Sequence, residues 1–320
     1  MVAWKKQKAG FEESLGYLKG RQEGNITSFK TPWAKVNSAT VDGLEWHSMS
    51  VLGGRPGSGK TLVKDQLIKE AFWLNTADNF RVLEFSLEML AKNSAIRAYS
   101  SELGVSYKYL CSADGKLSAE DFDKCVAYAN EAVEYPIDIV EKAPNVDEFA
   151  MIVDEYMQTH RRQDGTFTKT VVTLDHSLLL KTKQRQTRND MLYDFGELVT
   201  ALKRKYPIIF LILSQLNRAI DHPDRNEDGK YGNYVLESDI FGADALLQHA
   251  DLVIGLNRPG KQKIRFYGPD KYIVPDDKLL VMHFLKCRNG DVGLAFFNAA
   301  FERMSIDEAP TPPQQQGRSF

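Results

Sequence analysis

The stretch VLGGRPGSGKT, residues 51–61, places four glycines between an apolar run and a lysine–threonine pair. Glycine is entropically costly inside regular structure, so this cluster indicates a need for backbone freedom. From Gly54 onward the residues match the pattern G-x-x-x-x-G-K-[ST], in which backbone N–H groups and the positive end of the following helix surround phosphates. We expect Lys60 to contact the β- and γ-phosphates of a nucleoside triphosphate and Thr61 to bind Mg²⁺. The predicted phosphate loop comprises Gly54, Arg55, Pro56, Gly57, Ser58, Gly59, Lys60 and Thr61.

Length and composition limit the alternatives. A chain of 320 residues can form one large domain or two modest ones with a full core. Its 41 basic and 43 acidic residues give a net charge of -2, so any nucleic-acid surface must be local. Cys111, Cys125 and Cys287 form no CxxC pair, which fits a reducing compartment and gives no sign of zinc. With no apolar run of about 20 residues and no secretion signal, we expect a cytoplasmic protein (host cytoplasm if viral) with no membrane contact.

Beyond the phosphate loop, short apolar segments alternate with longer segments of helical periodicity. Strands that are apolar almost throughout are covered on both faces, as in a parallel sheet flanked by helices. The sequence therefore predicts an α/β domain. The expected strands span residues 46–54, 80–87, 135–141, 168–176, 206–215 and 250–256, and the main helices span residues 61–75, 145–162 and 189–205.

The two ends of the chain predict separate elements. Residues 11–21 form a short amphipathic helix by their spacing, which either packs on its own domain or docks on a neighbouring subunit. Two apolar segments, 278–287 and 292–298, flank the turn residues RNGD and predict a β-hairpin. The final segment is polar and rich in Pro and Gln, and we expect it to be disordered. The predicted organisation is a helix and loop over residues 1–44, a nucleotide-binding α/β domain over residues 45–305 and a tail over residues 306–320.

Polar side chains end three of the predicted strands. Asp175 is placed to orient the water shell of a magnesium ion, although a lone aspartate there is also a common turn cap. Glu88 is a candidate for the group that activates water, or an ordinary first-turn glutamate favoured by the helix dipole. Gln215 can hydrogen-bond a γ-phosphate. Because ligands gather at the carboxyl ends of parallel strands, we expect these side chains to meet around the phosphate loop.

A basic segment follows Asp175. Residues 181–188, KTKQRQTR, contain four cations and no acid, as sequence-independent contacts to nucleic-acid phosphates require; a solvated surface loop is the ordinary alternative. A second loop, residues 217–248, is long, polar and rich in turn formers. Loops of that length in a compact domain are functional or disordered.

Five segments together resemble the DnaB-like family of replicative helicases, hexameric motors with a RecA-like fold. They occur in the family's order and roughly its spacing, and the resemblance runs from about residue 45 to 305. It implies a RecA-like P-loop NTPase with a mostly parallel central sheet flanked by helices and a C-terminal β-hairpin. The segments are GRPGSGKT (54–61), FSLEM (85–89), the strand ending in Asp175, LSQLNR (213–218) and KCRNGDVG (286–293).

The resemblance implies roles for the candidate residues. Asp175 would support the metal, Glu88 would activate the attacking water and Gln215 would sense the γ-phosphate. Lys286 and Arg288 would reach into the next subunit's site as trans-acting fingers, where a cation stabilises transition-state charge.

The resemblance also implies partners and an activity. It predicts a homo-hexameric, ATP-dependent replicative DNA helicase that translocates on single-stranded DNA, with primase and a helicase loader as further partners. In such rings the basic segment and the long loop line the pore. The implied DNA contacts are Lys181, Lys183, Arg185, Arg188 and Arg218.

Four departures separate this chain from bacterial DnaB-like proteins. SDIFGAD (238–244) replaces an arginine-containing segment, His176 replaces a tyrosine, and residues 260–277 form an insertion that we expect to be a surface hairpin. Only about 45 residues precede the first strand, where bacterial relatives carry a helical domain that contacts primase, so the resemblance is to compact phage-type members. A RecA- or RadA-like recombinase, a small-molecule P-loop kinase and a loader or clock-type ATPase remain as alternatives.

Overall fold

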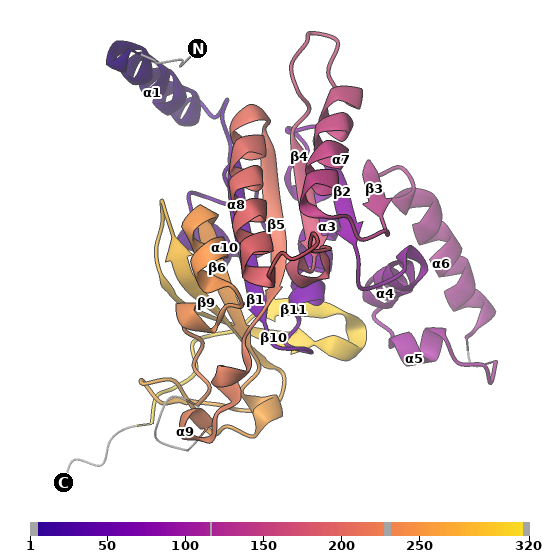
Figure 1. The fold of residues 1–320 in the computed structure, drawn as a ribbon. Helices are drawn as coiled ribbons and strands as arrows, with labels where there is room; N and C mark the ends of the chain where they lie inside the picture. Colours follow the sequence, from indigo (N-terminus) through magenta and orange to yellow (C-terminus); the bar gives the residue numbers. More distant parts are fainter. Residues whose placement is uncertain (1–5, 116, 227–231, 316–320) are drawn as a thin grey trace.

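The computed structural model describes residues 6–115, 117–226 and 232–315, and its centre is a nine-stranded sheet (Figure 1). The strand order is β11-β10-β9-β6-β1-β5-β4-β2-β3. The six strands from β6 to β3 in this order run parallel, and the remaining three are antiparallel. This confirms the predicted α/β fold and its C-terminal hairpin. The strands are β1 (Ser48–Gly54), β2 (Arg81–Ser86), β3 (Ile137–Val140), β4 (Thr170–Asp175), β5 (Ile208–Gln215), β6 (Leu252–Asn257), β9 (Leu279–Cys287), β10 (Gly293–Ala300) and β11 (Ser305–Glu308).

Helices cover both faces of this sheet, so the central strands β1 and β4 are buried along their whole length and β5 is buried except at Gln215. The apolar residues of α7, α8 and α10 form one core cluster with one face. Those of α3 and of the segment from Phe29 to Leu44 form a second cluster on the other. The group α4, α5 and α6 lies beside the β3 edge (Figure 1). The helices are α1 (Gln7–Gln22), α2 (Ala34–Ala39), α3 (Lys60–Leu74), α4 (Ala91–Leu103), α5 (Tyr107–Leu110), α6 (Ala119–Ala132), α7 (Val146–Thr159), α8 (Arg188–Lys205), α9 (Pro223–Asn226) and α10 (Ala243–His249).

Helix starts follow local capping chemistry. The Asn145 side chain accepts from Glu148 N and the Glu148 side chain accepts from Asn145 N, which closes a capping box at the start of α7. Thr187 and Asp190 form the same arrangement at α8. Such boxes satisfy backbone N–H groups that have no partner within the helix, so both helices begin within one residue of the predicted positions.

The N-terminal segment divides into two parts. Helix α1 buries none of its residues and projects away from the sheet (Figure 1). Residues 29–44, in contrast, are integral to the core, because Phe29, Trp33 and Leu44 are buried. The predicted boundary at residue 45 therefore falls too late, and α2 occupies a stretch that was predicted to be a loop.

The C-terminal boundary also differs from its prediction. Strand β11 pairs with β10 through Glu308, and Ala309 is buried. The first residues of the predicted tail thus complete the sheet, while residues 316–320 lie outside the described residues. The insertion at 260–277 contains the predicted hairpin, formed by β7 (Phe266–Tyr267) and β8 (Tyr272–Ile273). Across the described residues, no helix is both long and apolar enough to cross a membrane.

Candidate nucleotide site and interface residues

The phosphate loop connects β1 to the first residue of α3. Gly59 has φ +100°, a conformation that L side chains rarely adopt. A Cβ on Gly54 would lie 2.1 Å from Ser58 Oγ, so this position also requires glycine. The 15-residue helix α3 points its N-terminus at the loop, which favours anion binding.

Lys60 lies within this loop and is buried. Its Nζ donates to Gly54 O at 2.8 Å and to Arg55 O at 3.3 Å. Burial lowers the pKa of Lys60, while the nearby Asp175 and Glu88 carboxylates oppose that shift. The amine is thus held at the mouth of the loop by carbonyl groups, in a position from which it can turn to an incoming phosphate.

The Thr61 hydroxyl donates to Asp175 Oδ2 at 2.9 Å, which joins α3 to the end of β4. Asp175 is buried, and its second carboxylate oxygen has no partner. Hydroxyl and carboxylate oxygens are the ligands that Mg²⁺ prefers, and the unpartnered oxygen fits a metal or a metal-bound water. No group of three His, Cys, Asp or Glu side chains capable of holding a metal occurs among the described residues. An ion here would therefore take its remaining ligands from nucleotide phosphates and water.

Sheet register brings the remaining candidates together. Gly54 is paired with Gln215, and Ser86 is paired with Asp175. Gln215 Nε2 donates to His176 Nε2 at 3.1 Å. Burial lowers the pKa of His176, which keeps the ring neutral and able to accept this bond at neutral pH. Glu88 is exposed just beyond β2, and its charge acts on both His176 and Lys60.

Two site residues were missed by the sequence analysis. The Arg258 guanidinium lies 3.4 Å from the centroid of the Phe301 ring, and its Nη1 donates to Gly57 O at 3.1 Å. A Cβ on Gly59 would lie 3.1 Å from the Phe301 ring. The stacked pair therefore borders the phosphate loop with a flat, cationic surface. Arg258 directly follows β6, so its position at the carboxyl edge of the sheet could have identified it as a candidate ligand-binding residue. No feature of the sequence around Phe301 indicated that it would contact the phosphate loop.

The candidate fingers lie at the other edge of the sheet. Because β9 is antiparallel to β6, its last residue, Cys287, pairs with Leu252 at the start of β6. Lys286 Nζ donates to Leu247 O, and burial lowers the pKa of Lys286, with the nearby Arg288 charge adding to that shift. The Arg288 guanidinium is half-exposed and forms an ion pair with Asp251 at 3.2 Å.

The two sets of residues are therefore separated along the strands. Asp251 N donates to Met49 O, at the start of β1, whereas the phosphate loop begins at Gly54. Met49 and Gly54 are five residue steps apart along β1, which corresponds to about 16 Å. Arg288 cannot reach its own chain's phosphate loop across that distance.

The predicted DNA-binding residues are all exposed, but they differ in their surroundings. Lys183 Nζ forms an ion pair with Asp147 at 2.7 Å. Arg188 is the first residue of α8 and donates to Leu178 O at 2.7 Å. Part of the second loop, residues 227–231, lies outside the described residues. The exposed set is Lys181, Lys183, Arg185, Arg188 and Arg218.

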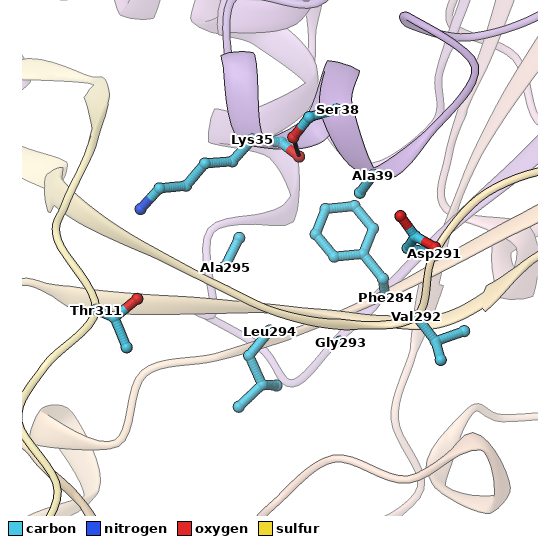
Figure 2. A pocket seen from close by; sticks show the side chains of 10 residues that line it. All are labelled: Lys35, Ser38, Ala39, Phe284, Asp291, Val292, Gly293, Leu294, Ala295 and Thr311. Carbon is cyan, nitrogen blue, oxygen red and sulfur yellow. Dashed lines mark hydrogen bonds between the residues drawn. The ribbon is translucent and has the colours of Figure 1, made fainter.

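A separate cavity of about 330 Å³ lies between α2 and the β9–β10 hairpin (Figure 2). The Lys35 side chain extends over it, and its amine donates to the carbonyls of Phe296 and Ala309. On the other side, Asp291 N donates to Ala39 O at 2.8 Å. These bonds use the cation for internal support, so the cavity marks where the N-terminal segment braces the hairpin.

Comparison with known proteins identifies the family and several related sequences. Residues 29–305 match the family model described as the DnaB-like helicase C terminal domain. The chain is 24% identical over 307 residues to the replicative DNA helicase DnaB of Geobacillus stearothermophilus, covering 91% of this chain and 60% of that protein. It is 24% identical over 235 residues to DnaB of Helicobacter pylori strain J99, covering 73% of this chain and 44% of that protein. The chain thus spans about half to two thirds of the length of these curated relatives.

Solved structures share the fold. A solved structure described as an ATPase domain superposes with a TM-score of 0.77 at 19% identity, covering 93% of this chain and 98% of that domain. A DnaB-like replicative helicase, described with its interactions with primase, superposes with a TM-score of 0.75 at 17% identity, covering 97% of this chain and 68% of the other.

Proposed function

Because this chain belongs to the DnaB-like helicase C-terminal domain family, we propose that it is the ATPase motor of a replicative DNA helicase. It binds ATP with Mg²⁺ between subunits of a ring, a homo-hexamer, and translocates on single-stranded DNA. The observation that carries this proposal is the separation of the phosphate loop from Arg288 within one chain. Each chain offers two half-sites at opposite edges of its sheet, and only a neighbouring copy can complete either one.

The chain's own residues divide the work of phosphoryl transfer to water. Lys60 and the backbone of the phosphate loop would hold the phosphates, while Thr61 and Asp175 would hold Mg²⁺, which when bound would stabilise the negative charge of the transferring phosphoryl group. Glu88, free to face the loop from the end of β2, accepts a proton from the attacking water. Gln215 detects the γ-phosphate by exchanging its bond to His176 for one to the phosphate.

Arg288 acts on the neighbouring site. A half-exposed guanidinium at the subunit surface is suited to enter another chain's phosphate site and stabilise charge in the transition state. The pKa of Lys286 is lowered by its burial and by the nearby Arg288 charge. When its amine leaves the Leu247 carbonyl, Lys286 is a second cation that can enter the neighbouring phosphate site. The Arg258–Phe301 stack borders the nucleotide on the side of the phosphate loop.

Ring assembly draws on helix α1. Its apolar residues Phe11, Leu15 and Leu18 are each more than half exposed, an arrangement that is stabilised when another surface covers it. An apolar groove of about 640 Å³ between α3, α4 and α6, which includes Phe72 and Tyr128, lies at the far side of the same molecule from α1 (Figure 1). We assign this groove to α1 of a neighbouring copy.

DNA binds through the exposed cations of the loop after β4 and through Arg218. These contacts reach the phosphate backbone and carry no sequence information. Primase and a loader are further partners; a related helicase is described with its interactions with primase.

The decisive experiment measures ATP hydrolysis with and without single-stranded DNA, for the wild type and for Arg288→Ala mixed in varied ratios. A ring motor should be stimulated by DNA, and Arg288→Ala subunits should inactivate more than their own share of sites. Absence of DNA stimulation, together with activity that falls only by dilution, would favour a kinase or a switch-type ATPase instead. Strand-separation assays then distinguish a helicase from a recombinase.

A second measurement tests assembly. Leu15→Ser/Leu18→Ser should convert rings to monomers in light scattering while leaving the thermal midpoint of the domain unchanged, since neither side chain is buried in the chain. Persistence of the ring in this variant would exclude α1 as the assembly element.

A further inference from the structure

Asp251 lies at a junction between three elements, just before β6. Its Oδ2 accepts from Met49 N at 2.9 Å and pairs with Lys203 of α8. Its backbone N donates to Met49 O at 2.8 Å. These bonds fix the carboxylate relative to β1, the strand that carries the phosphate loop, and to α8.

The second carboxylate oxygen of Asp251 faces Arg288. Oδ1 lies 3.2 Å from Arg288 Nη1, and Arg288 N donates to Asp251 O at 2.8 Å. Arg288 is therefore held at both its backbone and its guanidinium by one residue. Among the described residues, no other carboxylate pairs with this guanidinium.

Side-chain hydrogen bonds hold the backbone on both sides of the Asp251–Arg288 pair. Lys203 also donates to His249 O at 3.2 Å, and Thr200 Oγ1 bonds His249 Nδ1 at 2.9 Å, so the segment leading to Asp251 is tied to α8. The next residue of the hairpin turn, Asn289, donates from Nδ2 to Glu45 Oε2 at 2.8 Å. The backbone at Arg288 is thus braced on both sides, which leaves the long side chain as the element whose direction must be set.

We propose that Asp251 is the positioning residue for Arg288: it directs the guanidinium of one subunit toward the phosphate site of the next. This inference rests on the proposed function, in which Arg288 acts in trans. Asp251 contacts no nucleotide in this scheme. By holding the half-exposed Arg288 side chain in one orientation before the neighbour binds ATP, it reduces the conformational entropy that the side chain loses when it contacts the phosphates.

The size of the effect follows from the exposure of the pair. With the Arg288 side chain 54% exposed, an ion pair of this kind is weak, and its loss should slow ATP cleavage about two- to fivefold. Asp251→Asn keeps the size of the side chain and an oxygen for Met49 N. Glu197→Gln, on an exposed residue of α8 whose charge acts on His249, removes the same charge nearby and is the matched control, with unchanged cleavage expected.

The test assigns the defect to one side of the subunit interface. Lys60→Ala subunits lack a working phosphate loop but carry an intact Arg288. Asp251→Asn subunits mixed with excess Lys60→Ala therefore combine a working phosphate loop with a correctly held guanidinium. Single-turnover cleavage of ATP on DNA, per intact phosphate loop, should return to the level of wild type mixed with the same excess. Asp251→Asn in an Arg288→Ala background should add no further loss.

A parallel mixture separates the two levels of inference. If Arg288→Ala is not complemented by Lys60→Ala, Arg288 does not act in trans and the proposed function fails. If Arg288→Ala is complemented but Asp251→Asn is not, or if Asp251→Asn alone cleaves ATP at the wild-type rate, the positioning role is refuted. Should Asp251→Asn fail to form rings, Asp251→Glu keeps the charge beside Lys203 while displacing the carboxylate, and the same complementation is expected of it.

Discussion

Replacing Asp175 with Asn separates a metal-binding role from a structural one. The aspartate accepts from Thr61 Oγ1 at 2.9 Å through one oxygen and leaves the other buried without a partner. The amide keeps the shape and an acceptor for Thr61. Weakening that charged hydrogen bond costs about 1 kcal/mol, whereas removing a buried charge with an unsatisfied oxygen recovers a similar amount. The free energy of unfolding of the nucleotide-free protein should therefore stay within about 1 kcal/mol of the wild type.

The functional effect should be much larger. If Asp175 holds Mg²⁺ or its water shell, losing the carboxylate charge lowers magnesium affinity or turnover by about 10- to 100-fold. Urea unfolding without nucleotide gives the first quantity, and ATP hydrolysis across a magnesium titration gives the second. Asp78, a buried aspartate paired with Lys169 at 2.5 Å, provides the control: Asp78→Asn should lose about 1.5–3 kcal/mol of stability with an unchanged magnesium dependence.

The opposite pattern would refute the argument. A loss of more than about 2 kcal/mol in Asp175→Asn, with an unaltered magnesium requirement in the folded fraction, would identify Asp175 as a structural cap at the end of β4.

Three further predictions concern other parts of the molecule. Arg258→Ala removes a cation that contacts Gly57 O of the phosphate loop, so it should weaken ATP and ADP binding alike by about fivefold, or about 1 kcal/mol, as measured by calorimetry. A loss confined to ATP would contradict its place beside the phosphate loop. Lys181→Ala should reduce the slope of log binding constant against log salt concentration for single-stranded DNA by about 0.7. Lys183→Ala should change this slope less, because Lys183 is already paired with Asp147. Equal slopes for the two variants would argue against this distinction. Burial lowers the pKa of His283 to about 3, so below pH 6.5 the imidazole binds a proton in the unfolded chain but not in the folded chain, and the free energy of unfolding should fall by about 1.4 kcal/mol per pH unit. His283→Gln should flatten the pH dependence of thermal unfolding between pH 6.5 and 5. An unchanged slope would show that another group governs this pH dependence.

The sheet was predictable because its chemistry is local. Strand β5 begins with six apolar residues, β4 has apolar residues at three of its six positions, and capping boxes mark the starts of α7 and α8. Helix α2 has only six residues, too few for a periodic pattern, and is held by Trp33 Nε1 donating to Ile306 O at 3.2 Å. That contact joins residues 273 positions apart, and no local signal in either segment announces it.

The site divides in the same way. Lys60, Thr61 and Asp175 sit in motifs or at strand ends, where sequence and local geometry coincide. Phe301 reaches the phosphate loop only because β10 returns antiparallel to β9 and the chain then turns at the sheet edge. Asp251 lies in an ordinary apolar run, and its contacts with Lys203 and Arg288 arise from tertiary packing alone.

In the proposed function, the direction of β9 explains why one chain does not complete its own nucleotide site. A parallel β9 would end at the carboxyl edge of the sheet, and Arg288 would then follow it into the vicinity of the phosphate loop. Because β9 is antiparallel to β6, the same residue emerges at the opposite edge, about 16 Å along the strands from Gly54. A chain could keep both the phosphate-loop motif and the segment around Arg288 and still place them side by side, so the motifs alone do not impose the need for a neighbour. In this proposal strand direction imposes that need, and Asp251, which ties Arg288 to the first residues of β1, holds Arg288 at a fixed distance from the phosphate loop of its own chain.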